Sequence, residues 1–190
     1  LSRGSYFALD VTNPTAPKYL WEINSTSTGF SELGETWSRM TFAKMRINNV
    51  VRLVAFVGAG YDNNEDMRFG NTQLFPDGSD ESTESTLRAD DATELASPGT
   101  SQQFNPRGRG IYVLELATFD SSGAPSFHAT PIKLWEYVYD SARESTDPDN
   151  NPTYSFPTDI VPLDSDFDGL IDKLYAGDTG GNLWRFDVKS

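Results

Sequence analysis

The stretch "DSDFDGLIDKLYAGDTGGNLWRFDV", residues 164–188, joins an aspartate-rich loop to a segment that alternates as a β-strand does. Its ending, "LWRFDV" (183–188), has the same design as "YFALDV" (6–11) and "IYVLEL" (111–116). In all three, apolar residues recur at every second position and the fifth residue is acidic. A period of two predicts half-buried strands. The shared apolar positions are Phe7, Leu9 and Val11; Tyr112, Leu114 and Leu116; and Trp184, Phe186 and Val188.

Further repeats surround these strands. Leu-Trp-Glu follows the first two of them, in "KYLWEI" (18–23) and "IKLWEY" (132–137). The second and third of these strands each follow an apolar segment that ends in a glycine turn. That segment in turn follows "TWSRMTFAKM" in the first case and "DIVPLDSD" in the second. Repeated four-stranded units predict an all-β chain that forms part of a modified β-propeller. A sandwich of two stacked sheets is the alternative.

One unit carries a long polar insertion, residues 62–106, with ten acidic residues and two basic ones. Such a composition cannot bury enough apolar surface to offset its ordering entropy, which predicts a flexible surface excursion or an arm that binds a partner. The remaining ~145 residues correspond to about three blades of ~40–50 residues. We therefore expect residues 1–190 to form a single partial propeller domain. The start at Leu1, inside a strand, predicts a fragment of a longer protein.

The composition excludes several classes of function. The net charge of −13 argues against nucleic acid or an anionic membrane as a partner. The chain has no cysteine, so thiolate chemistry and disulfides are excluded. Its one histidine, His128, has no nucleophile motif beside it and is predicted to lie in a surface loop. No apolar run approaches the ~20 residues needed to span a bilayer, so no direct membrane insertion is expected.

The opening loop has the spacing of a calcium site. If Asp164 is position 1, then Asp166 and Asp168 are positions 3 and 5, a glycine is position 6, and Leu170 and Asp172 are positions 7 and 9. EF-hand loops use side-chain oxygens at 1, 3 and 5, a backbone carbonyl at 7 and glycine at 6. The predicted metal ligands are therefore Asp164, Asp166, Asp168 and Asp172 with the Leu170 carbonyl.

Position 12 of this loop is Tyr175 and not glutamate, so the loop closes at nine residues. Predicted strands flank it, where an EF-hand has helices. Because catalytic metals need an open position and a neighbouring base, a structural or regulatory Ca²⁺ is the better interpretation, and no enzymatic activity is expected. A second acidic stretch, residues 140–152, lacks the alternation and the glycine and is read as a turn.

The order of these motifs resembles a known family. "TWSRMTFAKM", "AFVGAGYDN", "GRGIYVLEL", "DSDFDGLID" and above all "YAGDTGGNLWRFDV" are similar to the C-terminal propeller of the PilC/PilY type IV pilus biogenesis and tip-adhesin proteins. The resemblance covers most of the chain outside the insertion. It implies a modified propeller and a nine-residue calcium loop that governs pilus extension against retraction.

The same resemblance implies a role in adhesion and twitching motility. It places the protein, after export, at the outer membrane, the cell surface or the pilus tip (fimbrium). The implied partners are other pilus components, such as minor pilins and the secretin machinery, or a surface or host receptor.

Two alternatives to this function remain open. "GDTGGNLWRFD" is also similar to the tryptophan repeats of quinoprotein dehydrogenase propellers, although the vicinal cysteines common there are missing. Integrin α propellers carry similar aspartate-rich loops between strands, although they repeat the loop in several blades. The second alternative would make the chain a calcium-dependent interaction propeller of another system.

Overall fold

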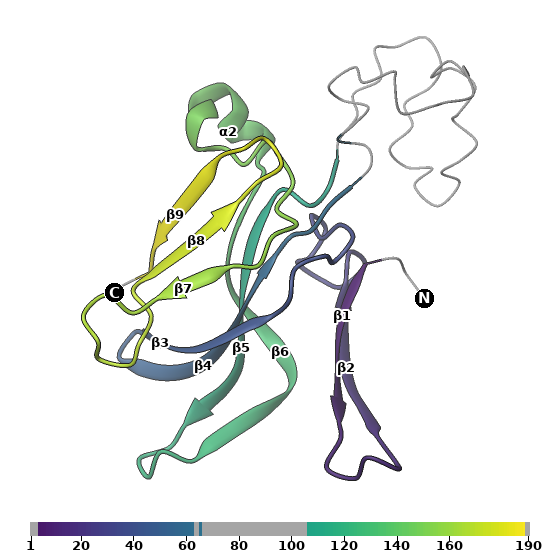
Figure 1. Ribbon diagram of the computed structural model, residues 1–190, viewed down its shortest axis with the longest axis vertical. Coiled ribbons are helices and arrows are strands. Elements are labelled where there is room, and N and C mark those ends of the chain that lie inside the picture. Colours follow the sequence, from purple (N-terminus) through teal and green to yellow (C-terminus); the bar gives the residue numbers. More distant parts are fainter. Residues whose placement is uncertain (1–3, 63–64, 66–105, 189–190) are drawn as a thin grey trace.

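The computed structural model describes residues 4–62, 65 and 106–188, and these form antiparallel sheets with little helix. Most of the predicted insertion therefore lies outside the described residues. The first sheet pairs β1 with β2, the second has the order β3-β4-β5-β6, and the third has the order β7-β8-β9 (Figure 1). The strands are β1 (Ser5–Asp10), β2 (Lys18–Asn24), β3 (Thr41–Ile47), β4 (Val50–Gly58), β5 (Gly110–Phe119), β6 (Pro125–Val138), β7 (Val161–Leu163), β8 (Lys173–Gly177) and β9 (Leu183–Asp187).

The predicted repeat is confirmed by the order of the strands. β5 and β6 are the aromatic strand and the Leu-Trp-Glu strand of the middle sheet, and β3 and β4 precede them. The first sheet contains the equivalents of β5 and β6, and the third contains the equivalents of β3, β4 and β5. The all-β class is thus confirmed, while the four-stranded unit is complete only in the middle sheet.

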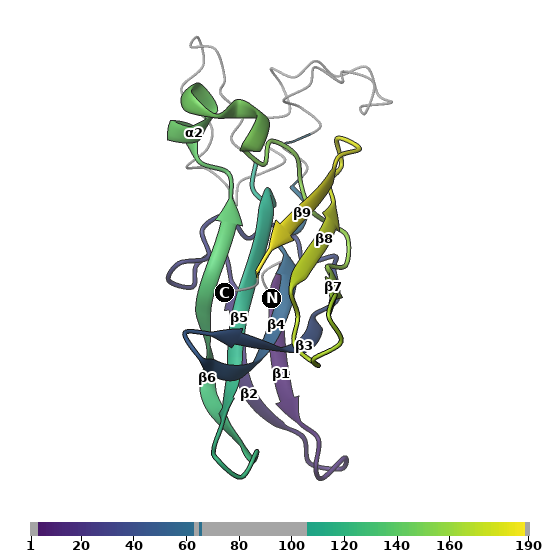
Figure 2. The same cartoon turned by 90° about the vertical axis from the view of Figure 1, so that its left-hand side faces the viewer.

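The two central strands of the middle sheet, β4 and β5, are largely buried on both faces. Val54 and Phe56 of β4 pack toward the third sheet, whereas Ala55 and Val57 pack toward the first. β5 alternates in the same way, and all of these side chains are inaccessible to solvent. Consecutive sheets that pack face to face give a propeller-like stack of three layers, and Figure 2 shows the same stack with the third sheet turned toward the viewer. The arrangement does not fit the two-layer sandwich.

In the second and third sheets, a side-chain hydroxyl just before the first strand accepts a hydrogen bond from the glycine that ends the second strand. Ser38 Oγ accepts a hydrogen bond from the Gly58 N–H at 3.1 Å, and Thr158 Oγ1 accepts one from the Gly177 N–H at 3.3 Å. Glycine is required at residue 58, because a Cβ there would lie 2.2 Å from the Phe156 carbonyl oxygen. The Tyr6 hydroxyl also bonds Ser38 Oγ at 2.6 Å, and burial raises the pKa of Tyr6 to about 12.

Two local expectations were wrong. His128 does not lie in a surface loop: it belongs to β6, and its Nε2 is 2.6 Å from Oε1 of the buried Glu115, which also pairs with Arg52. The acidic stretch read as a turn contains the six-residue helix α2 (Ser141–Thr146), followed by the short 3-10 helix η3 (Pro148–Asn150). Asp140 caps α2 by accepting from the Ala142 N–H. None of the described helices is long and apolar enough to cross a membrane.

The buried middle sheet predicts a large effect for Phe56→Ala. This side chain is fully buried between the second and third sheets, so its truncation should cost about 3–5 kcal/mol of unfolding free energy through lost burial and a cavity. Urea unfolding measures the loss. Phe42→Ala on the neighbouring strand is the control: Phe42 is 57% exposed and should cost less than about 1 kcal/mol. Similar losses in the two variants would contradict the packing described above.

Candidate metal centre

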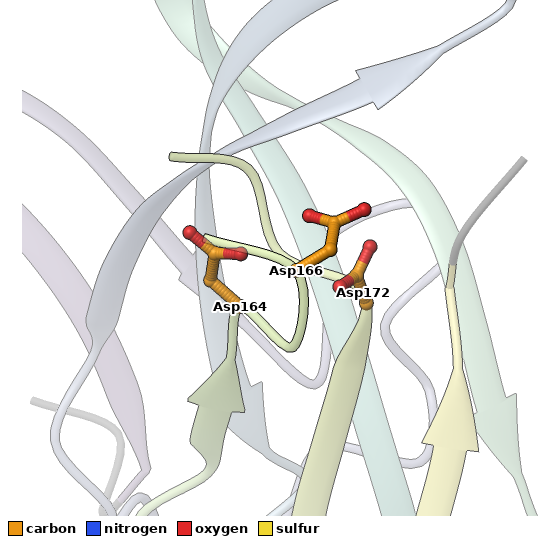
Figure 3. Close-up of side chains that lie close together, drawn as sticks. All are labelled: Asp164, Asp166 and Asp172. Atoms are coloured by element: carbon orange, nitrogen blue, oxygen red, sulfur yellow. The ribbon is translucent and has the colours of Figure 1, made fainter. Parts of the chain in front are cut away.

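The acidic loop occupies the connection between β7 and β8. These strands run antiparallel with Leu163 opposite Lys173, so the residues that follow β7 and precede β8 are brought together. Carboxylate oxygens of Asp164, Asp166 and Asp172 lie within 4.8 Å of one another. Figure 3 shows the three carboxylates gathered where β7 ends and β8 begins. An all-oxygen set of this kind suits a hard divalent cation.

Backbone N–H groups hold two of the carboxylates in the loop. Asp164 accepts from the N–H of Phe167 at 2.7 Å and from that of Gly169 at 2.8 Å. Asp172 accepts from both the N–H and the hydroxyl of Ser165, at 2.8 and 2.6 Å. These bonds curl residues 164–172 around their own acidic side chains, and none of them involves an ion.

The structure therefore brings together three of the four predicted carboxylates. Asp168 lies outside the cluster of gathered carboxylates, and its Oδ1 accepts from the Leu170 N–H at 2.8 Å. The Leu170 carbonyl was predicted as the fifth ligand, and its N–H makes this bond to Asp168. Asp168 is exposed, so packing does not fix the position of its carboxylate.

The buried end of the loop is attached to the sheets on both sides. The Ile171 N–H donates to the Lys44 carbonyl on β3 at 3.0 Å, which ties the loop to the middle sheet. Asp172 is 5% exposed, accepts through its carbonyl from the Val188 N–H and donates through its N–H to the Leu163 carbonyl. One of the predicted ligands, Asp172, is thus held in place by the surrounding backbone, while Asp166 is exposed.

A second buried carboxylate escaped the sequence interpretation. Glu65, which is 4% exposed, accepts from the Ser155 N–H at 2.9 Å and from the Thr179 hydroxyl. Its partners lie far along the chain, so no local pattern could have indicated this role. Nearby in sequence, Asp62 accepts from the Arg107 N–H at 2.9 Å. The bond between Asp62 and Arg107 joins the two ends of the predicted insertion, and the two bonds of Glu65 attach its first residues to Ser155 and Thr179.

The arginine that follows this junction is also buried. Arg109 is 1% exposed, pairs with Glu32 at 3.4 Å and stacks over the Tyr139 ring. Burial raises the pKa of Glu32, although the positive charge of Arg109 opposes the rise. We interpret Arg109 and Glu32 as a structural ion pair, because their opposite charges balance each other. The pair does not offer the several carboxylates that a metal ion would need.

Fold and site together define a class: a repeat module of packed antiparallel sheets with a candidate site for a hard cation in one inter-strand loop. Comparisons with known proteins specify the class further. No family model matches the chain. The chain is 26% identical over 182 residues, 96% of its length, to the type IV pilus biogenesis factor PilY1 of Pseudomonas aeruginosa. It is 41% identical over 51 residues, 25% of its length, to a PilY1 homolog of Xylella fastidiosa.

The chain is therefore related to the PilY1 type IV pilus biogenesis factors, and the family resemblance seen in its motifs is confirmed. It spans 10% of the Pseudomonas protein and 4% of the Xylella protein. Among solved structures, it matches the Pseudomonas aeruginosa PilY1 C-terminal domain with a TM-score of 0.46 and 23% identity, over 98% of this chain and 24% of that one.

The backbone of the loop predicts that Phe167→Asn stabilises the protein. Phe167 has φ of 63°, a left-handed conformation that is costly for a bulky side chain and tolerated by asparagine, and its ring is 91% exposed. Thermal unfolding should show a gain of about 0.5–1 kcal/mol. Phe127→Asn is the control, because Phe127 is 66% exposed in a β-strand and should gain nothing. Equal effects of the two substitutions would refute the strain at Phe167.

Proposed function

We propose that this chain is a noncatalytic, calcium-binding module of the type IV pilus biogenesis machinery. The observation that carries the proposal is the cluster of Asp164, Asp166 and Asp172 in a chain related to PilY1 over nearly all of its length. Calcium is favoured over magnesium because the loop offers several flexible carboxylates and not a small octahedral cage. The carboxylates would also repel one another in the absence of a cation.

The residues present fit such an ion. Asp164, Asp166 and Asp172 would hold it, and Asp168 with the Leu170 carbonyl would complete the set after the bond between Asp168 and the Leu170 N–H opens. Bound Ca²⁺ supplies positive charge that neutralises the carboxylates. Because Asp172 directly precedes β8 and is bonded to Leu163 of β7, and its neighbour Ile171 is bonded to Lys44 of β3, that neutralisation would brace β7, β8 and the edge of the middle sheet.

At the level of the cell, we propose a place for the module on the exported pilus apparatus, at the outer membrane, the cell surface or the pilus tip. There it would support pilus extension against retraction, and with it twitching motility and adhesion. Its partners would be other pilus components, including minor pilins and the secretin machinery, or a surface receptor. Both relatives are type IV pilus biogenesis factors, which supports this assignment.

Calorimetric titration with Ca²⁺ tests the site directly. The wild-type chain should bind one ion, and Asp164→Asn and Asp166→Asn should each weaken binding at least about tenfold, since each removes a charged ligand. Asp168→Asn should also weaken binding if this carboxylate joins the set. Asp149→Asn is the control, because Asp149 lies in η3, away from the loop, and is exposed. Unchanged binding in the first two variants would remove the ligand assignment.

Chelation should loosen one part of the protein and leave the rest folded. With calcium removed, amide hydrogen exchange should rise over residues 164–172 and along β7 and β8, because repulsion among the carboxylates acts there. Exchange in the buried segments of β4 and β5, residues 54–58 and 110–115, should stay slow. A uniform rise across all the sheets would show that the ion stabilises the whole fold, contrary to the proposed local bracing.

A further inference from the structure

Asp168 is the only aspartate of the described residues that is followed by glycine, and the other such pair in the sequence, residues 77–78, lies outside them. An aspartate before glycine is open to an intramolecular reaction: the next backbone nitrogen attacks the side-chain carbonyl carbon and closes a five-membered ring. Glycine favours this ring because it has no Cβ to crowd the nitrogen and because its backbone is conformationally free. A predicted metal ligand thus coincides with a chemically reactive pair of residues.

The side chain of Asp168 is folded back over the peptide bond that would react. Its Oδ1 accepts from the Leu170 N–H at 2.8 Å, which brings the carboxyl group beside the nitrogen of the residue in between, Gly169. Asp168 is exposed, so water reaches its carboxyl group. A Cβ built on Gly169 would meet no atom within 4 Å apart from its chain neighbours, so the ring has room to form.

A proton acceptor for the reaction is also in place. The Gly169 nitrogen must lose its proton in order to attack, and its N–H donates to Asp164 Oδ2 at 2.8 Å. A carboxylate at hydrogen-bond distance from the proton that is removed meets the geometric requirement for a general base. Asp164 Oδ1 accepts from the Phe167 N–H at 2.7 Å, and this bond orients the carboxylate at the end of β7 (Figure 3).

We propose that Asp168 is a modification site that converts spontaneously to isoaspartate when the loop holds no cation. In the first step a bond forms between the Gly169 nitrogen and Cγ of Asp168, and the Gly169 proton passes to Asp164. One carboxyl oxygen of Asp168 leaves as water after it takes up that proton and one more from the solvent. The product is a cyclic succinimide.

Water then opens the succinimide and returns the solvent proton. Attack at Cγ restores aspartate, whereas attack at the main-chain carbonyl carbon of Asp168 gives isoaspartate, in which the chain runs through the former side chain. One water is lost and one is gained, so the reaction needs no oxidant, reductant or second substrate. The mass of the chain is unchanged.

The modification alters the candidate metal centre, and bound calcium protects against it. Isoaspartate adds one methylene group to the backbone before Gly169, so the Leu170 carbonyl and Asp172 no longer follow Asp164 at the spacing of a calcium loop. The protection rests on the proposed function: an ion held by the carboxylates of Asp164 and Asp168 withdraws the base and the attacked group from the reaction together.

Incubation of the full 190-residue chain with EDTA at neutral pH tests the modification, with proteolysis and electron-transfer mass spectrometry to measure isoaspartate at each site. Isoaspartate should accumulate faster at Asp168 than at Asp120. Asp120 is the internal control, because it is exposed and accepts from the N–H of Ser122, two residues on, at the same 2.8 Å, but is followed by serine. Equal rates at the two sites would overturn the proposal.

Asp164→Asn tests the base. The amide keeps the shape of the side chain but is a poor proton acceptor, so isoaspartate formation at Asp168 in EDTA should slow at least about tenfold. An unchanged or higher rate in this variant would overturn the role of Asp164.

Excess Ca²⁺ separates this inference from the proposed function. The ion should lower the rate at Asp168 and leave the rate at Asp120 unchanged. An unchanged rate at Asp168, in a chain that calorimetry shows to bind calcium, would overturn the protection. A chain that binds no calcium would refute the proposed function instead, whereas faster isomerisation at Asp168 than at Asp120 in EDTA would still support the modification.

Discussion

The structure depends on one constraint: β4 and β5 must bury both of their faces at once. Val54 and Phe56 contact one neighbouring sheet, and Ala55 and Val57 contact the other. Because side chains alternate with a period of two, a slip of one residue would exchange the two sets and spoil both interfaces. The register of the middle strands therefore fixes the positions of the first and third sheets together.

The candidate metal centre inherits its position from that packing. The acidic loop could curl through its own hydrogen bonds alone. Its position relative to the middle sheet, however, depends on the bond between Ile171 and Lys44, which requires the third sheet to pack against the middle sheet. At the far end of the same sheet, Thr179 bonds Glu65. The third sheet is thus held to the rest at both ends by polar contacts as well as by its apolar face. An ion bound in this loop would lie next to the contact between Ile171 and Lys44, where the third sheet meets the middle sheet, which agrees with the proposed structural role.

Sequence patterns predicted what depends on periodicity and on short spacing. The alternation in residues 111–116 and 183–188 identified β5 and β9, and the repeat gave the order of strands. The spacing of the aspartates brought three of the four predicted carboxylates to one place. The sequence alone could not predict the pairing of His128 with Glu115 or the anchoring role of Glu65, because these residues meet their partners only through tertiary packing. Asp168 differs for another reason: its local bond to Leu170 satisfies the carboxylate without the cluster.

Apolar alternation also has a limit that Phe7 and Leu9 illustrate. The pattern predicts which side of a strand is apolar, and it does so equally well for Phe7, Tyr112 and Trp184. It does not predict whether that side is covered, because cover comes from a different sheet. Tyr112 is buried since a sheet precedes its own, whereas Phe7 is exposed at the end of the stack. The same sequence signal thus marks a buried face in one unit and an exposed face in another, and only the order of the sheets separates the two.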